Sequence, residues 1–107
     1  MIRAGIIGGA GYTAGELLRL LINHPDVEVA WVHSTSNAGN PVTDIHQGLI
    51  GETFLRFSDT TPWKEIDVVF FCTPHGQSRT FIKENDIPAD VKIIDLSNDF
   101  RLHDDDP

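Results

Sequence analysis

This chain of 107 residues has a single cysteine, Cys72, and few basic residues. One cysteine excludes an intrachain disulfide and is typical of a reducing compartment. Only 8 lysines and arginines stand against 16 aspartates and glutamates, which gives a formal net charge of −8. We therefore expect no nucleic-acid partner, because no basic stripe is available to displace counterions from phosphates.

Long apolar runs and metal-ligand patterns are also missing. No run is long enough to span a bilayer and no signal-peptide pattern follows Met1, so we expect a cytoplasmic location and no membrane partner. Cys72 closes the apolar run 68–71, and we interpret it as a buried residue at a strand end rather than a nucleophile. Neither a helical histidine pair nor a Cys/His spacing typical of zinc occurs, which predicts no metal site. The five histidines are His24, His33, His46, His75 and His103.

A glycine-rich turn joins the short apolar run 3–7 to an amphipathic segment. The turn can be written Gly8-x-x-Gly11-x-x-Ala14 or Gly9-x-Gly11-x-x-Ala14, and the common dinucleotide fingerprint is G-x-G-x-x-G/A. Glycines let the backbone approach phosphates, and the amides and dipole of the following helix favour negative charge. Glycine clusters also make ordinary strand-to-helix turns, so the pattern alone leaves both interpretations open.

An amphipathic helix is predicted directly after this turn. Thr13 and Glu16 fit a capping box, which would start the helix slightly later than a phosphate-binding turn prefers. The predicted apolar face consists of Ala14, Leu17, Leu18, Leu21 and Ile22.

Strands and helices alternate along the rest of the chain. A helix is predicted at 77–84, and a long polar loop at 33–51 with one helical turn around 42–46. A further helical turn is predicted to start at 61–64. Four more strands are predicted from apolar runs at 27–32, 54–57, 67–72 and 91–96. This alternation indicates an α/β fold, a Rossmann-like doubly wound parallel sheet.

Ligands of such folds bind outside the carboxyl ends of the strands, so the loops at 8–14, 33–37, 73–76 and 97–101 are candidate sites. NAD-specific domains usually place Asp or Glu after the second strand, whereas this chain has Ser34, Thr35 and Ser36 there. Without a carboxylate the site would not repel a 2′-phosphate, and the hydroxyls can donate hydrogen bonds to it. NADP(H) is therefore the predicted cofactor, with an ordinary polar loop as the alternative.

The candidate loops at 73–76 and 97–101 each contain one basic residue, and the role of each residue has two interpretations. His75 could transfer a proton or be a polar loop residue. Arg101 could bind an anionic substrate through its guanidinium, or pair with Asp99 or Asp104.

Three segments together resemble the N-acetyl-gamma-glutamyl-phosphate reductase family: GGAGYTAGEL at 8–17, TPHG at 73–76 and IDLSNDFRL at 94–102. The resemblance runs across essentially the whole chain. The glycine motif is shared with aspartate-semialdehyde dehydrogenases, but the Gly-Tyr-Thr continuation and the third segment favour the reductases. A departure occurs at Ala14-Gly15, where the family commonly has glycine first, and alanine is accepted at that site of the fingerprint.

The resemblance implies an NADPH-dependent reductive dephosphorylation in arginine biosynthesis, which converts N-acetyl-glutamyl phosphate to N-acetylglutamate semialdehyde and phosphate. In that family the nucleophilic cysteine lies in a Ser-Asn-Pro-Gly-Cys-Tyr-Pro-like segment, which this chain lacks. We therefore expect 1–107 to form the N-terminal part of a dinucleotide-binding domain, without the catalytic and oligomerisation domain. Alone it would be inactive, with no catalytic residue of its own, while the full-length protein would take a small acyl phosphate and form a homo-oligomer through the missing domain.

The resemblance also implies which residues bind ligands. Arg101 would contact the substrate phosphoryl group. An aspartate-semialdehyde dehydrogenase-like cofactor domain and a stand-alone, non-catalytic dinucleotide-binding module are the alternative functions. The cofactor-side residues would be Gly8, Gly11, Tyr12, Thr13, Ser34, Ser36, Thr73, His75 and Ser97.

Overall fold

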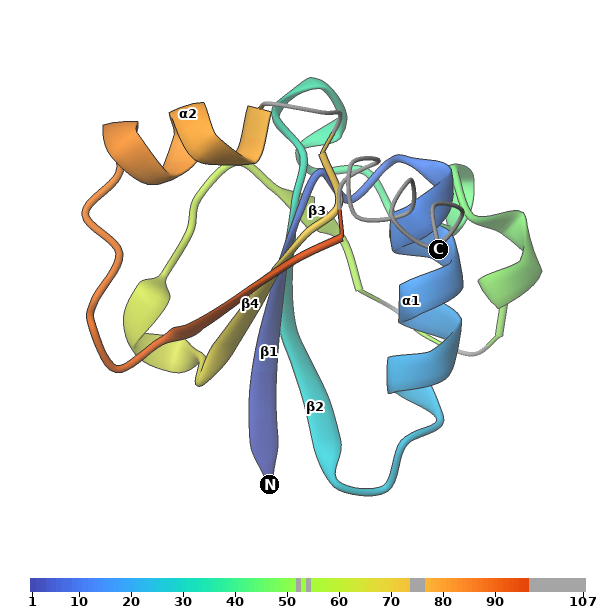
Figure 1. The fold of residues 1–107 in the computed structure, drawn as a ribbon. Coiled ribbons are helices and arrows are strands. Elements are labelled where there is room, and N and C mark those ends of the chain that lie inside the picture. The colour runs from blue at the N-terminus through green and yellow to red at the C-terminus, as the bar shows by residue number, and fades with distance from the viewer. Residues whose placement is uncertain (52, 54, 74–76, 97–107) are drawn as a thin grey trace, which may run out of the picture.

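The computed structural model describes residues 1–51, 53, 55–73 and 77–96, and Figure 1 shows its fold. A five-stranded sheet with the order β3-β2-β1-β4-β5 forms its centre, and each neighbouring pair of strands is parallel. This arrangement confirms the Rossmann-like α/β class. The strands are β1 (Ile2–Ile7), β2 (Val27–His33), β3 (Phe57–Ser58), β4 (Val68–Phe71) and β5 (Lys92–Asp95).

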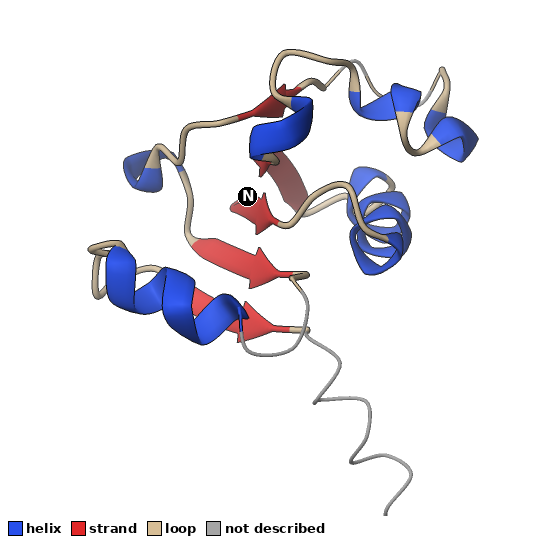
Figure 2. Cartoon of the chain, turned by 90° about the horizontal axis from the view of Figure 1, so that it is seen from above, coloured by secondary structure: helices blue, strands red, loops and turns tan. Residues whose placement is uncertain are grey.

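Helices cover both faces of the sheet (Figures 1 and 2). Helix α1 (Tyr12–Ile22) and the short 3₁₀ turns η2 (Val42–Asp44) and η3 (Gln47–Leu49) lie on one side. Helix α2 (Gln77–Glu84) and the turn η4 (Trp63–Glu65) lie on the other. The chain moves from β1 to β2 in one direction and later returns to β4 on the opposite side of β1, so the strand order reverses at β1.

Two apolar clusters hold the layers together. The cluster on the α1 face joins the helix to the loop after β2, because Val42 and Leu49 are buried in it with Leu18 and Phe57. The cluster on the α2 face contains Trp31, Val69 and Phe71, with Trp63 and Phe81 packed against it. The loop of 34–51 is therefore anchored to the core through the buried side chains of Val42 and Leu49.

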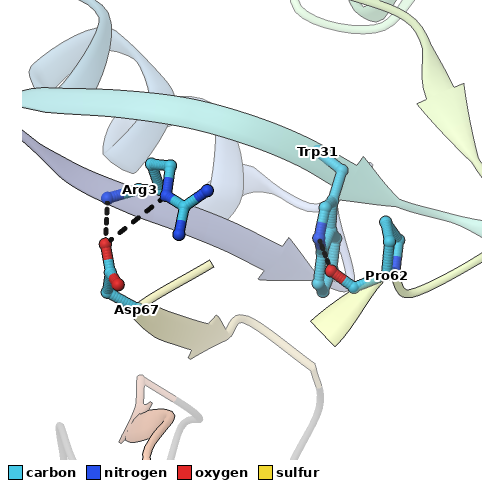
Figure 3. A network of polar contacts seen from close by, with 4 residues as sticks. All are labelled: Arg3, Trp31, Pro62 and Asp67. Carbon is cyan, nitrogen blue, oxygen red and sulfur yellow. Dashed lines mark hydrogen bonds and ion pairs between the residues drawn. The ribbon is translucent and has the colours of Figure 1, made fainter. Parts of the chain in front are cut away.

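Polar contacts at the start of β1 and β4 fix the register of these two strands (Figure 3). The Arg3 N–H donates to Asp67 Oδ2 over 2.9 Å, and the Arg3 Nε lies 3.7 Å from the same oxygen. The Asp67 N–H in turn donates to the Arg3 carbonyl oxygen over 2.7 Å. On the α2 face, the Trp31 indole N–H donates to the Pro62 carbonyl oxygen over 3.2 Å and holds the segment before η4 against the sheet.

The start of α1 differs from the capping-box expectation. The helix begins at Tyr12 with Gly11 as its N-cap, and no side chain caps it. Gly11 has φ −81° and ψ 170°, so the chain enters the helix directly from the glycine turn. Glu16 does not reach back to the helix start but accepts a hydrogen bond from Arg19 Nη2 over 2.9 Å.

The third strand was expected at 54–57, and this boundary is wrong: β3 pairs with β2 only through Phe57 and Ser58. The preceding residues bond to the loop instead. Arg56 forms an isolated antiparallel bridge with Pro41, and the Val42 N–H donates to the Leu55 carbonyl oxygen over 2.9 Å. Residue 54 lies outside the described residues.

The other predicted elements are present, with small changes at their ends. Helix α2 has the predicted bounds, while β4 and β5 are shorter at both ends than their apolar runs. The long loop contains three short turns rather than one, since η1 (Thr35–Asn37) precedes η2 and η3. In the described part of the chain, neither helix has the length and hydropathy needed to cross a bilayer.

Candidate functional site

Two adjoining cavities open at the carboxyl ends of β1, β2 and β4, where the strand order reverses. They share Gly8, Ser34 and Thr73 in their walls. The first has a volume of about 340 Å³ and is lined by Gly8, Ala10, Gly11, Tyr12, Thr13, Ser34, Cys72, Thr73 and Leu96. The second, of about 200 Å³, is lined by Ile7, Gly8, His33, Ser34, Thr35, Ser36 and Thr73.

Seven of the nine residues that were predicted to lie on the cofactor side come together in these walls. Gly8, Gly11, Tyr12, Thr13, Ser34 and Thr73 line the first cavity, and Ser36 lines the second. His75, Ser97 and Arg101 lie outside the described residues. Five further lining residues were not predicted to contact the cofactor: Ile7, Ala10, His33, Cys72 and Leu96. The strand-end position of Cys72 and Leu96 was the available signal.

Gly8 shapes the floor shared by the two cavities. Its φ is +81°, a conformation that side chains rarely adopt. A Cβ atom there would lie 2.9 Å from Thr73 Cγ2 and 3.0 Å from the Cys72 carbonyl carbon. Glycine is therefore required for the backbone of the turn to lie this close to the end of β4.

The amino-terminal end of α1 faces the first cavity without a side-chain cap. The helical ladder starts with the Gly15 N–H donating to the Gly11 carbonyl oxygen over 3.2 Å, so the amides of Tyr12, Thr13 and Ala14 precede it. No acidic residue occupies the first turn, and Tyr12 is 82% exposed. These amides and the positive end of the helix dipole favour an anionic group in the cavity.

Hydroxyl groups follow β2 in the second cavity. Ser34 is buried, and its Oγ accepts a hydrogen bond from Asn37 Nδ2 over 3.1 Å, which leaves the hydroxyl proton available for donation. The side chains of Thr35 and Ser36 are exposed. No carboxylate is among the described residues that line either cavity.

His33 contributes a half-buried imidazole to this wall. Burial lowers its pKa, and the attraction of Asp59, which acts in the opposite direction, is the smaller effect. The ring packs edge-on against Phe81 of α2, with centroids 5.9 Å apart. Burial therefore disfavours a positive charge in this wall.

Thr73 has a buried hydroxyl oxygen for which the described residues provide no hydrogen-bond partner. Leaving such a group unpaired costs about 1–3 kcal/mol. Because Thr73 lines both cavities, a polar atom of a bound ligand would satisfy it.

Cys72 lies beside Thr73 and carries a protonated thiol. Burial, and then the nearby Asp95 carboxylate, raise its pKa to about 11. Since the thiolate is the nucleophile, this thiol is poorly suited to attack an acyl phosphate at neutral pH. Throughout the described ranges, no group of three or more His, Cys, Asp or Glu side chains is arranged to hold a metal ion.

Comparison with known proteins adds independent observations. The sequence model of the family described as "Semialdehyde dehydrogenase, NAD binding domain" matches residues 3–107. N-acetyl-gamma-glutamyl-phosphate reductase of Phocaeicola vulgatus is 62% identical over 106 residues, and that of Bacteroides thetaiotaomicron is 60% identical over 106 residues. Each match covers 99% of this chain but 33% of the relative, so the chain spans about a third of the length of these proteins.

A solved structure shares the fold. The crystal structure of aspartate semialdehyde dehydrogenase with NADP from Candida albicans matches with a TM-score of 0.74 and 21% sequence identity. The match covers 94% of this chain and 31% of that one. At this identity the likeness concerns the arrangement of the sheet and helices alone.

Proposed function

This chain belongs to the semialdehyde dehydrogenase, NAD binding domain family, and we propose that it is the NADP(H)-binding portion of an N-acetyl-gamma-glutamyl-phosphate reductase. The identities of 62% and 60% over 99% of the chain support the reductase assignment. The full-length protein would then reduce N-acetyl-glutamyl phosphate to N-acetylglutamate semialdehyde with release of phosphate. The aspartate-semialdehyde dehydrogenase alternative rests on the glycine motif that those enzymes share and on a fold likeness at 21% sequence identity.

The paired cavities at the reversal point of the sheet carry the cofactor assignment. Two observations indicate a fit to a dinucleotide. Gly8 leaves space that a side chain would fill, and the buried Thr73 hydroxyl has no partner among the described residues. Both belong to the wall that the two cavities share, where a ligand that extends from one to the other would pass.

Each cavity would hold a different part of the cofactor. The amides at the start of α1 would bind the pyrophosphate, with Gly11, Tyr12 and Thr13 around it. The hydroxyls of Ser34 and Ser36 would donate to the 2′-phosphate, and no carboxylate in the described wall would repel it. When bound, the cofactor supplies the hydride.

The nucleophile would come from the part of the protein outside this chain. Cys72 has a raised pKa and a place in the cavity wall, and we assign it no catalytic role. Residues 1–107 would therefore be inactive alone, and homo-oligomer formation would belong to the domain that they lack. His75 and Ser97 as cofactor contacts, and Arg101 as a contact of the substrate phosphoryl group, complete this proposal.

Calorimetric titration of the full-length protein with NADPH and NADH tests the cofactor assignment. We expect NADPH to bind more tightly. Tighter NADH binding would overturn the role of Ser34 and Ser36, and no binding of either cofactor would overturn the cofactor site. Turnover of N-acetyl-glutamyl phosphate but not aspartyl phosphate would distinguish the reductase from the aspartate-semialdehyde dehydrogenase alternative.

A further inference from the structure

His46 lies in the long loop after β2, yet its side chain reaches the glycine turn between β1 and α1. The imidazole Nε2 is 2.7 Å from the Gly9 carbonyl oxygen. A carbonyl oxygen can only accept a hydrogen bond, so Nε2 carries the proton and donates. A side chain 37 residues away along the chain thus holds one peptide group of the turn.

The segment that carries His46 is fixed by its own packing. Val42 and Leu49, on either side of it, are 0% and 3% exposed in the core cluster on the α1 face. The His46 N–H donates to the Val42 carbonyl oxygen over 3.0 Å, and the ring lies 6.3 Å from the Phe57 ring, centroid to centroid. The segment that places the imidazole next to Gly9 is therefore held by buried side chains and a backbone hydrogen bond.

Gly9 is held at both ends of its backbone. Its N–H donates to the His33 carbonyl oxygen over 3.0 Å, so this amide is not available to a ligand. Its carbonyl oxygen accepts from His46. No cis peptide bond is present in the described part of the chain, and in a trans peptide the C=O and the following N–H point in opposite directions. Holding the Gly9 carbonyl therefore also sets the direction of the Ala10 N–H.

Ala10 lines the 340 Å³ cavity. No backbone acceptor for its N–H occurs among the described residues. We propose that His46 is a positioning residue of the cofactor site, which holds the Gly9 carbonyl on the helix side and thereby directs the Ala10 N–H to the pyrophosphate. This inference rests on the proposed cofactor function and adds a residue that touches no part of the ligand.

Gly15 provides a second way to disturb the same contact. A Cβ atom on Gly15 would lie 2.6 Å from His46 Nδ1 and 3.0 Å from its Cε1. Gly15→Ala must therefore displace the imidazole that bonds to Gly9, although alanine is otherwise the better helix former. In a His46→Ala background the obstacle is gone, and the same Gly15→Ala change should raise the melting temperature instead of lowering it.

The experiment measures NADPH dissociation constants at 10 °C for the full-length protein and for the variants His46→Ala, His46→Gln, Gly15→Ala and Gly15→Ala/His46→Ala. Loss of one well-aligned hydrogen bond predicts about tenfold weaker binding for His46→Ala. His46→Gln should restore affinity because a glutamine amide can donate from the place of Nε2. Gly15→Ala should weaken NADPH binding, and the double variant should bind no more weakly than His46→Ala.

Three results would overturn this role for His46. They are unchanged NADPH affinity in His46→Ala, no rescue by His46→Gln, and Gly15→Ala effects on affinity that add fully to those of His46→Ala. The ratio of NADPH to NADH affinity should remain constant across the series, because the contact concerns the pyrophosphate that both cofactors share. Failure of the unaltered protein to bind NADPH would instead contradict the proposed function itself.

Discussion

Gly8 and Thr73 leave no room between them for a methyl group, since a Cβ atom on Gly8 would lie 2.9 Å from Thr73 Cγ2. The two residues lie just beyond neighbouring strands, since Gly8 directly follows β1 and Thr73 is the second residue after β4. Their close approach forms the wall common to both cavities. The stability of the protein and its affinity for the cofactor should therefore both depend on Gly8 and Thr73.

Gly8→Ala should reduce both stability and NADPH binding. The backbone conformation at φ +81° costs a side-chain residue roughly 1–2 kcal/mol, and the contact with Thr73 adds to it. We expect NADPH affinity to fall at least about tenfold, because the methyl group enters the cavity wall. Urea unfolding and calorimetric titration measure the two effects.

Gly39→Ala is the matched control for Gly8→Ala. Gly39 has φ +88°, but no atom of the described residues lies within 4 Å of the place of its Cβ, and Gly39 lines neither cavity. Gly39→Ala should lose stability through backbone strain alone, and its NADPH affinity should be unchanged. Equal loss of NADPH affinity in both variants would contradict the role of Gly8 in the cavity wall.

Thr73→Val should move stability and affinity in opposite directions. Valine has nearly the same shape but removes a buried hydroxyl that has no partner among the described residues. Without ligand, the free energy of unfolding should increase by about 1 kcal/mol, and the melting temperature should rise accordingly. With NADPH, the affinity should fall because the ligand loses a hydrogen bond. Scanning calorimetry with and without NADPH measures both, and a lower melting temperature without ligand would show that the hydroxyl is already satisfied.

Helices and strands with a strong local sequence pattern were predicted correctly, and those with a weak pattern were not. Helix α2 has the expected bounds, and β1, β2 and β4 lie within a residue or two of their apolar runs. The third strand was misplaced because Arg56 forms an isolated bridge with Pro41, and the Leu55 carbonyl oxygen accepts from the Val42 N–H. No local pattern indicates these partners. Thr13 and Glu16 matched a capping motif, but the conformation of Gly11 determined where α1 begins.

The candidate site also has a part that the sequence predicts and a part that it does not. Gly8, Ser34 and Thr73 follow strands, so the general rule for α/β folds was enough to place them together. The contact between His46 and Gly9 joins residues 37 apart through a loop without regular strands. The burial of Val42 and Leu49 packs this loop against the helix, and no hydrophobic periodicity in the sequence indicates that packing.

Ser36→Asp should change the preference between the two cofactors. A carboxylate in the second cavity would repel a 2′-phosphate and could accept hydrogen bonds from an unmodified ribose. We expect the ratio of NADPH to NADH affinity to fall at least about tenfold. Repulsion between the new carboxylate and the 2′-phosphate, two close charges near the surface, is worth a few kcal/mol, which is enough for this change. Titrations with both cofactors measure the ratio.

Asn40→Asp is the control for the added charge. Asn40 is exposed on the same loop and lines neither cavity. It adds the same negative charge to the protein, so any change that it causes reflects the long-range field. A fall in the NADPH to NADH ratio of equal size in both variants would contradict a 2′-phosphate contact at Ser36.

Cys72 should make the protein lose stability at alkaline pH. Its pKa is about 11 in the folded protein, against an ordinary value of 9.0, because burial and the Asp95 carboxylate disfavour the thiolate. A raised pKa contributes stability that is fully present below pH 9 and is lost as the pH rises through 11. The loss should be on the order of 2 kcal/mol. Urea unfolding at a series of pH values from 8 to about 11 measures it.

Cys72→Ala separates this titration from those of other groups. The variant lacks the thiol, so its free energy of unfolding should fall less steeply between pH 9 and 11 than that of the unaltered protein. Alkylation by iodoacetamide gives a second readout, because only the thiolate reacts: at pH 8 the folded protein should react far more slowly than the protein in urea. Parallel pH profiles for the two proteins, together with rapid alkylation of the folded chain, would show that the thiol ionises normally and would reopen its role as a nucleophile.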